Sequence, residues 1–160
     1  MAKKNKQIQT IMLDLYRKCV GNAAREAMYQ RVYNEFNKIA IVETKVKDPQ
    51  AQRINKLLHA TRALETGLET FLDLYGLVPT QLKYHTMGSY MKKLQTPPSG
   101  RNTFSKIPSH MFAKGFSNDD SIRNKRNKYL HQADQYPTPQ ETKVFLDEIY
   151  KFYAAVLSLA

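Results

Sequence analysis

Apolar residues recur along most of the chain at steps of three and four positions, the spacing that places them on one face of an α-helix. The first such stretch covers residues 8–19 and the second covers residues 24–39. Gly21 and Asn22 separate them, and we expect the helix to break there because both residues favour turns. Cys19 lies on the apolar stripe, so we expect a small buried side chain there.

Two further stretches have recognisable helix starts. Asp48-Pro49 supplies an N-cap followed by proline at the first helical position, and the apolar stripe behind it covers residues 54–75. Gly76 can end that helix in the left-handed conformation. The sequence Thr-Pro-Gln-Glu at 138–141 is a capping box with proline in the first turn, and it precedes an apolar stripe over residues 144–157.

The middle of the chain, residues 77–118, is less regular. A short helix fits residues 84–94, but the sequence Pro-Pro-Ser-Gly at 97–100 interrupts it. Pro108 and Gly115 keep the stretch that follows broken. We expect a long, basic, irregular segment here, and in a small domain such a segment is more often functional than decorative.

Asn118 or Asp119 is the expected cap of a further helix that ends at about Ala133. No stretch alternates apolar and polar residues between turn dipeptides, so we expect no sheet. The predicted fold class is all-α, an up-and-down bundle of four long helices with one or two short extra helices. A length of 160 residues fits a single domain over residues 1–160.

The composition excludes several classes of protein. One cysteine cannot form an internal disulfide, and the chain has neither a secretory signal nor a run of about 18 apolar residues. We therefore expect a soluble, cytoplasmic protein that does not bind a membrane. The four histidines lack the spacing of a zinc site, and His59 within a predicted helix is expected to be structural. No phosphate-binding glycine loop or dinucleotide fingerprint occurs, so we expect no metal and no cofactor.

Basic residues outnumber acidic residues by 25 to 14, which gives a net charge of +11. The excess is uneven, because residues 81–131 hold 10 basic and 2 acidic residues, whereas residues 39–80 are neutral overall. This local charge of +8 favours a polyanionic partner such as a nucleic acid. A surface that only keeps the protein in solution has the same composition, so charge alone leaves both interpretations open.

The helix at the end of the basic region carries the best candidate for chemistry. Arg123, Arg126, Asn127 and His131 lie within about 140° of its circumference when successive residues turn by about 100°. Ile122, Tyr129 and Ala133 form an apolar stripe beside them, which we expect to pack on the bundle. The polar face thus holds two guanidinium groups, an amide and an imidazole.

These groups suit cleavage of a phosphodiester bond in RNA. Arg126 and Arg123 can hold a phosphate and stabilise the extra negative charge of its transition state. His131 can accept a proton from a ribose 2′-OH or donate one to the leaving 5′-oxygen, and Asn127 can hold the imidazole or the phosphate in place. One histidine cannot easily do both, and a two-fold dimer would supply two. A solvated basic helix with an incidental histidine is the alternative.

Other residues of the basic region are candidates for RNA contacts. The basic ones are Lys125, Lys128, Lys92, Lys93 and Arg101. Tyr84, Tyr90 and Phe104 could stack on unpaired bases, although burial in the core is the commoner fate of such aromatic residues. His85 and His110 also lie in this region and could touch a ligand.

The sequence Arg-Asn-Lys-Tyr-Leu-His at 126–131 has the form R-N-x-x-x-H and resembles the R-x(4–6)-H motif of the HEPN superfamily. The resemblance implies an α-helical bundle that forms a homodimer, with paired motif helices at a composite active site. It also implies a metal-independent endoribonuclease that leaves a 2′,3′-cyclic phosphate and a 5′-OH. Arg126 would bind the phosphate, His131 would be the acid or base, and Asn127 would support them. Such proteins commonly act as toxins or as effectors of abortive infection and antiviral defence.

One branch of that superfamily is paired with a nucleotidyltransferase antitoxin and has a tyrosine two residues after the motif histidine. Ala133 occupies this position here, so we do not predict that type of antitoxin, although another antitoxin or regulatory protein remains a possible partner. Two alternatives stay open. One is a catalytically inactive HEPN-type module for RNA binding or assembly, and the other is a helical DNA-binding regulator, for which no compact helix-turn-helix spacing is present.

Overall fold

The computed structural model describes residues 2–77, 82–96 and 104–159, with the side chains from residue 9 onward. Within these ranges every regular element is a helix and no strand occurs, as predicted for the fold class. The elements are α1 (Ala2–Cys19), α2 (Ala23–Lys45), α3 (Pro49–Leu74), α4 (Met87–Gln95), α5 (Ser109–Phe112), the π-helical turn η2 (Ala113–Ser117), α6 (Ile122–His131) and α7 (Pro139–Leu157). No helix in the described ranges is long and apolar enough to cross a membrane.

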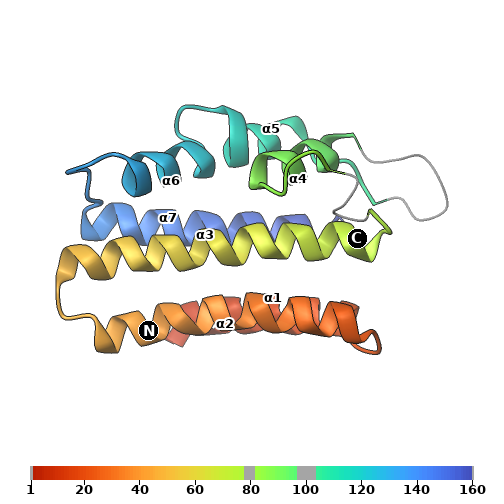
Figure 1. The fold of residues 1–160 in the computed structure, drawn as a ribbon, viewed down its shortest axis with the longest axis horizontal. Helices are drawn as coiled ribbons and strands as arrows, with labels where there is room; N and C mark the ends of the chain where they lie inside the picture. Colours follow the sequence, from red (N-terminus) through yellow and green to blue (C-terminus); the bar gives the residue numbers. More distant parts are fainter. Residues whose placement is uncertain (1, 78–81, 97–103, 160) are drawn as a thin grey trace.

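The helices lie in three layers, which Figure 1 shows from the side. Helices α3 and α7 form the middle layer, α1 and α2 cover one side of it, and α4, α5 and α6 cover the other. Leu64, Leu68 and Phe71 of α3 and Tyr153 of α7 are fully buried at the centre of one continuous apolar core. The short helices α4, α5 and α6, called the outer layer below, therefore pack on the long helices α3 and α7.

Helix starts follow the predicted caps. Asn22 and Asp48 each accept a hydrogen bond from the backbone N–H three residues on, at 3.1 Å and 2.8 Å. Thr138 and Glu141 form the complete capping box, and Gly21 and Gly76 have the positive φ values of 89° and 71° that suit glycine. Cys19 is fully buried as expected, and burial raises the pKa of its thiol to about 11.

Three predictions for the outer layer were wrong. Residues 109–117 are helical, and Gly115 does not interrupt them. This glycine is instead required by packing, because a Cβ atom there would overlap the side chains of Met91 and Phe152. Ser121 caps α6 in place of Asn118 or Asp119, and α6 ends at His131. Ala133 is consequently exposed and does not extend the apolar stripe of that helix.

Candidate functional site

A pocket of about 570 Å³ opens between the middle layer and the outer layer that contains α6. Helix α3 contributes Thr61, Arg62 and Glu65 to its walls, and α6 contributes Arg123, Arg126 and Asn127. The segment 84–89, Lys92 of α4 and Phe116 of η2 complete the lining. The sequence predicted the α6 residues and Lys92 as functional, and the structure brings all four to one cavity.

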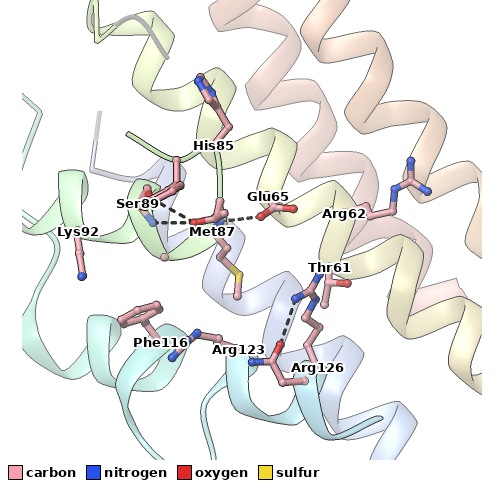
Figure 2. Close-up of a pocket in the computed structure, with 14 residues that line it drawn as sticks. Thr61, Arg62, Glu65, His85, Met87, Ser89, Lys92, Phe116, Arg123 and Arg126 are labelled. Carbon is pink, nitrogen blue, oxygen red and sulfur yellow. Dashed lines mark hydrogen bonds between the residues drawn. The ribbon is translucent and has the colours of Figure 1, made fainter. Parts of the chain in front are cut away.

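Arg126 and Asn127 form the part of the pocket nearest the end of α6. The Arg126 guanidinium donates a hydrogen bond from Nη1 to Oδ1 of Asn127 at 3.1 Å. Figure 2 shows this bond and shows Arg126 extending from α6 toward Thr61 of α3. The amide of Asn127 therefore orients the guanidinium and leaves its other donors for a ligand.

Arg123 is fixed by an aromatic ring. Its guanidinium lies over Phe116, with Cζ at 4.6 Å from the ring centroid (Figure 2). Phe116 belongs to the π-helical turn, in which the N–H of Asn118 donates to the carbonyl of Ala113 at 2.9 Å. Gly88 of α4 allows this ring to approach, since a Cβ atom at Gly88 would be only 2.6 Å from Phe116 Cε2. Short-range sequence patterns do not reveal such a turn.

The charge of the pocket is strongly positive. Arg62, Lys92, Arg123 and Arg126 contribute four cationic side chains to the lining, and Glu65 contributes its one carboxylate. The Arg62 guanidinium points away from Glu65, at the edge of the pocket (Figure 2). Arginine and lysine side chains at the walls of a cavity attract phosphate groups, and arginine can bind phosphate oxygens in pairs. The pocket is therefore suited to a phosphate-bearing ligand.

Glu65 also connects α3 to the first turn of α4. Its Oε1 atom accepts the backbone N–H of Met87 at 2.6 Å, and Thr86 accepts the N–H of Ser89 at 3.4 Å. These two bonds satisfy donors in the first turn of α4 and tie that turn to α3. Figure 2 shows Met87 between Glu65 and the arginines of α6, while the ring of His85 points away from those arginines.

His131 lies outside this pocket. It is the last residue of α6, its side chain is exposed, and it does not contribute to the lining of the cavity. Within the described ranges no hydrogen bond or ion pair of its ring occurs. Of the four residues predicted to form one site on this helix, Arg123, Arg126 and Asn127 line the pocket, whereas His131 lies beyond its edge.

The remaining predicted RNA-binding residues differ in their surroundings. Lys125 is bound to Glu148 at 2.9 Å and Asp120 at 3.4 Å. Burial alone would lower the pKa of Lys125, but these carboxylates raise it. Lys128 lies over the Tyr129 ring at 5.1 Å, and Lys93 is half-buried outside the pocket. Arg101 lies outside the described residues.

The aromatic candidates are mostly part of the core. Tyr90 and Phe104 are buried, at 2% and 4% exposure, which is the commoner fate expected for such aromatic residues and leaves neither ring free to stack on a base. Tyr84 is 59% exposed and lines the pocket, which keeps it accessible to a ligand. Tyr129 donates a hydrogen bond to Glu141 at 3.0 Å and anchors α6 to the start of α7. Burial first, and then that bond and the charge of Glu141, raise the pKa of Tyr129 to about 12.

The sequence did not point to Arg62, Glu65 or His85 as members of this pocket in particular. Arg62 and Glu65 belong to the polar face of a long amphipathic helix, where charged residues are ordinary. Only the return of residues 84–92 and 116–127 onto α3 brings them next to the α6 arginines. Their one signal is spacing: Glu65 lies three residues after Arg62 and four after Thr61, so these side chains share one side of the helix.

A buried carboxylate on α2, Glu35, neighbours Arg62 of the pocket lining. Glu35 is 7% exposed and lies 2.8 Å from Nδ1 of His59 and 2.9 Å from Nζ of Lys38. Its other neighbour is Arg62, whose Nε is 3.7 Å away. Burial alone would raise the pKa of Glu35, but these hydrogen bonds and the charge of Arg62 outweigh it and lower the pKa.

Glu35→Gln is expected to lower the free energy of unfolding at pH 7 by about 1–3 kcal/mol, because the amide cannot balance the cations around it. The folded carboxyl has a lower pKa than the unfolded one, so its stabilisation is complete above the ordinary carboxyl range and is lost as the pH falls through the folded pKa. Urea unfolding between pH 3 and pH 7 measures the difference from wild type, which should shrink in acid. Glu43→Gln, at an exposed carboxylate that pairs with Lys56, is the control with a smaller effect. An undiminished difference at pH 3 contradicts the prediction.

A second cavity, of about 740 Å³, lies between α1, α2 and α7. Tyr16, Tyr29 and Tyr33 form one wall, with centroid distances of 5.3 Å and 6.1 Å along the row. Tyr16 is 43% exposed although it lies within the apolar stretch 8–19. No basic side chain lines this cavity, so of the two described cavities only the first has a cationic lining.

No protein-family model, curated protein or solved structure matches this chain. Among the described residues no three His, Cys, Asp or Glu side chains gather as a metal site. The site geometry and the short resemblance at residues 126–131 are thus the basis for a function.

Proposed function

We propose that the protein is a metal-independent endoribonuclease of the HEPN type, built as one domain whose four long helices form an up-and-down bundle. The observation that supports it most is the position of α6. This helix places Arg126 and Asn127, joined by a hydrogen bond, in a cavity with four cations and carries His131 on an exposed turn beyond its edge. One helix thus offers a phosphate-binding pair and an accessible acid or base.

The proposed reaction needs one arginine and two histidines. Arg126 holds the scissile phosphate and stabilises the charge that develops as the ribose 2′-oxygen attacks phosphorus. A histidine accepts the 2′-OH proton, the bond from phosphorus to the 5′-oxygen breaks, and a second histidine protonates that oxygen. The products are a 2′,3′-cyclic phosphate and a 5′-OH. DNA lacks the attacking hydroxyl, so the substrate is RNA.

Two copies of the chain supply the two histidines. His131 is exposed in the single molecule, and the same is true of Lys128 one turn earlier on α6. A two-fold axis beside the end of α6 would bring both His131 side chains and both Arg126 side chains to a shared cleft. The homodimer is therefore part of the proposal, because one copy holds only half of the acid and base groups.

The biological setting follows from the resemblance. A HEPN-type ribonuclease without a resident inhibitor is toxic to the cell that makes it, which suits a toxin or an antiviral-defence effector controlled by an antitoxin or other regulatory protein. Ala133 in place of the tyrosine argues against control by nucleotide transfer to that side chain.

The second candidate is an inactive HEPN-type module that binds RNA or mediates assembly. The position of His131 outside the pocket favours it, because RNA binding needs only the cationic cavity. Such a module binds RNA with an affinity that falls steeply as salt rises, and it cuts no strand.

Labelled single-stranded RNA in excess EDTA separates the two candidates. The ribonuclease cuts the RNA and leaves 2′,3′-cyclic phosphate and 5′-OH ends, and replacing the ribose at the cut site by deoxyribose stops cleavage. RNA that is bound but stays intact supports the inactive module. A cut that leaves 5′-phosphate ends, or that needs a divalent cation, contradicts the proposed mechanism. Duplex DNA of the same length is the control for a DNA-binding regulator.

A further inference from the structure

The pocket, at about 570 Å³, is larger than a single phosphate needs. It extends from Arg126 and Asn127 past Met87 to Glu65 and Lys92, away from the exposed end of α6. We propose that it is a subsite for one whole nucleotide of the RNA, next to the bond that is cut, and that Glu65 selects guanine there. This inference rests on the proposed function and adds the base that the site prefers.

The volume and charge of the pocket fit one nucleotide. Cavities of about 300–1000 Å³ typically hold one small organic molecule, and this one measures about 570 Å³. Lys92 and Arg123 provide the cationic side on which a phosphate can lie (Figure 2). The Arg123 guanidinium lies over the Phe116 ring, with Cζ at 4.6 Å from the centroid, and the side chain is exposed, so it remains accessible to stack on a base or to bind a phosphate.

Glu65 is unusual as the one acidic side chain in this lining. One of its oxygens accepts the N–H of Met87, and no described lysine or arginine forms an ion pair with it. A carboxylate has about four lone-pair positions, so acceptor positions remain on Glu65 after the Met87 bond. Glu65 is half-buried, and a partly desolvated acceptor with open positions beside an apolar residue is what an N–H-bearing edge of a base requires.

Guanine satisfies this acceptor best. Its N1–H and N2–H₂ groups lie side by side and can meet both oxygens of a carboxylate. Adenine and cytosine each offer an exocyclic amino group but no second donor next to it. Uracil has one N–H between two carbonyl oxygens, which a carboxylate repels. The side chain of Met87 lies between Glu65 and the α6 arginines and provides an apolar surface for the base (Figure 2).

The pocket lies about one nucleotide away from the phosphate at which the proposed cleavage takes place. Asn127 is four residues before His131, which corresponds to about 6 Å along the helix axis. A strand whose scissile phosphate contacts Arg126 and a histidine at the end of α6 would therefore place a neighbouring nucleotide in the pocket. The proposal predicts cleavage beside guanine in single-stranded RNA.

Binding of single nucleotides tests the pocket without any cleavage. The 3′-monophosphates of guanosine, adenosine, cytidine and uridine are titrated against the full chain by calorimetry. Guanosine monophosphate should bind at least about tenfold more tightly than uridine monophosphate, since a paired contact to a base discriminates by about this factor or more. Glu65→Gln should remove the preference, while its amide oxygen still accepts the Met87 N–H and preserves the fold.

Matched variants separate the pocket from general charge. Glu69→Gln alters a carboxylate one turn further along α3 and outside the lining, and it should keep the guanine preference. Lys92→Ala should weaken all four nucleotides by a similar factor without changing their order, whereas Lys114→Ala removes an exposed charge outside the pocket and should change none of them. Equal binding of all four nucleotides, or a preference that survives Glu65→Gln, overturns the inference.

Cleavage mapping shows which of the two proposals fails. RNA that is cut without regard to guanine, by wild type and Glu65→Gln alike, leaves the ribonuclease proposal standing and overturns the subsite. Guanine-selective binding without any cleavage of RNA supports the subsite and overturns the ribonuclease. Cleavage beside guanine that becomes indifferent to the base in Glu65→Gln supports both.

Discussion

Alanine at position 131 will lower the rate of RNA cleavage by about a thousandfold, the scale on which a general acid or base contributes. His131 is exposed and makes no described side-chain contact, so the variant should unfold at the same temperature as wild type. RNA affinity at fixed salt should also be retained, because the cationic pocket is intact. Single-turnover cleavage of labelled RNA in EDTA measures the rate, and cleavage that persists in this variant refutes the assignment.

Arg126 should give a similar loss of rate with a different signature. Arg126→Ala removes both a phosphate contact and the partner of Asn127, so cleavage falls by about a hundredfold to a thousandfold and RNA binding also weakens. Arg126→Lys keeps the charge but loses the planar fork and should recover binding more than cleavage. Arg31→Ala, which removes an exposed charge on α2, is the control and should leave cleavage near that of wild type.

Mixed dimers test whether two copies share one site. Wild-type chains and His131→Ala chains are combined in equal amounts and allowed to exchange. If both histidines of a dimer are needed, activity falls to about a quarter, since about a quarter of randomly formed dimers hold two wild-type chains. If each chain works alone, about half of the activity remains. Differently tagged chains report whether exchange has taken place.

The helices of this protein were predictable from local patterns, but the pocket was not. The caps at Asn22, Asp48 and Thr138 act within one turn of chain, so the sequence places these helix starts correctly. The wrong predictions of backbone structure lie in residues 109–133, where Pro108 and Gly115 were expected to keep the chain broken and Asn118 or Asp119 to cap the next helix. There the burial of Gly115 depends on the tertiary packing of α4, η2 and α7. The cap of α6 is local, but the sequence offered Asn118, Asp119 and Ser121 within four residues, and Ser121 forms it.

The candidate site shows the same division. A six-residue motif sufficed to single out Arg126, Asn127 and His131 because all three lie on one short helix. Glu65 and Arg62 are about sixty residues away in the chain, and no spacing rule links them to α6. The structure also separates His131 from the pocket that holds its two partners, which the helical wheel alone placed on the same face. The proposed chemistry therefore requires the dimer, because one chain supplies a single histidine and that histidine lies outside the pocket.

The close contact between α3 and α7 at Gly67 predicts a second large effect, on the stability of the fold. Gly67→Ala should lower the free energy of unfolding by about 2–3 kcal/mol, although alanine is the better helix former by about 1 kcal/mol. A Cβ atom at this position would overlap the hydroxyl and ring of Tyr153, and Tyr153 is fully buried with its ring 6.1 Å from that of Phe36. The steric cost therefore outweighs the gain in helix propensity. Urea unfolding followed by circular dichroism measures the change.

A second substitution identifies Tyr153 as the cause. The Tyr153 hydroxyl is buried and has no hydrogen-bond partner among the described residues, so Tyr153→Phe alone should be neutral or should stabilise by up to about 1 kcal/mol. In the Gly67→Ala background it removes one of the overlapping atoms and should recover about 1 kcal/mol more than it gains alone. Thr66→Ala, a half-buried neighbour on α3, is the control with little effect. Strict additivity of the two substitutions would mean that the methyl group is accommodated by movement of α3 away from α7, and that the contact at Gly67 does not set the distance between these helices.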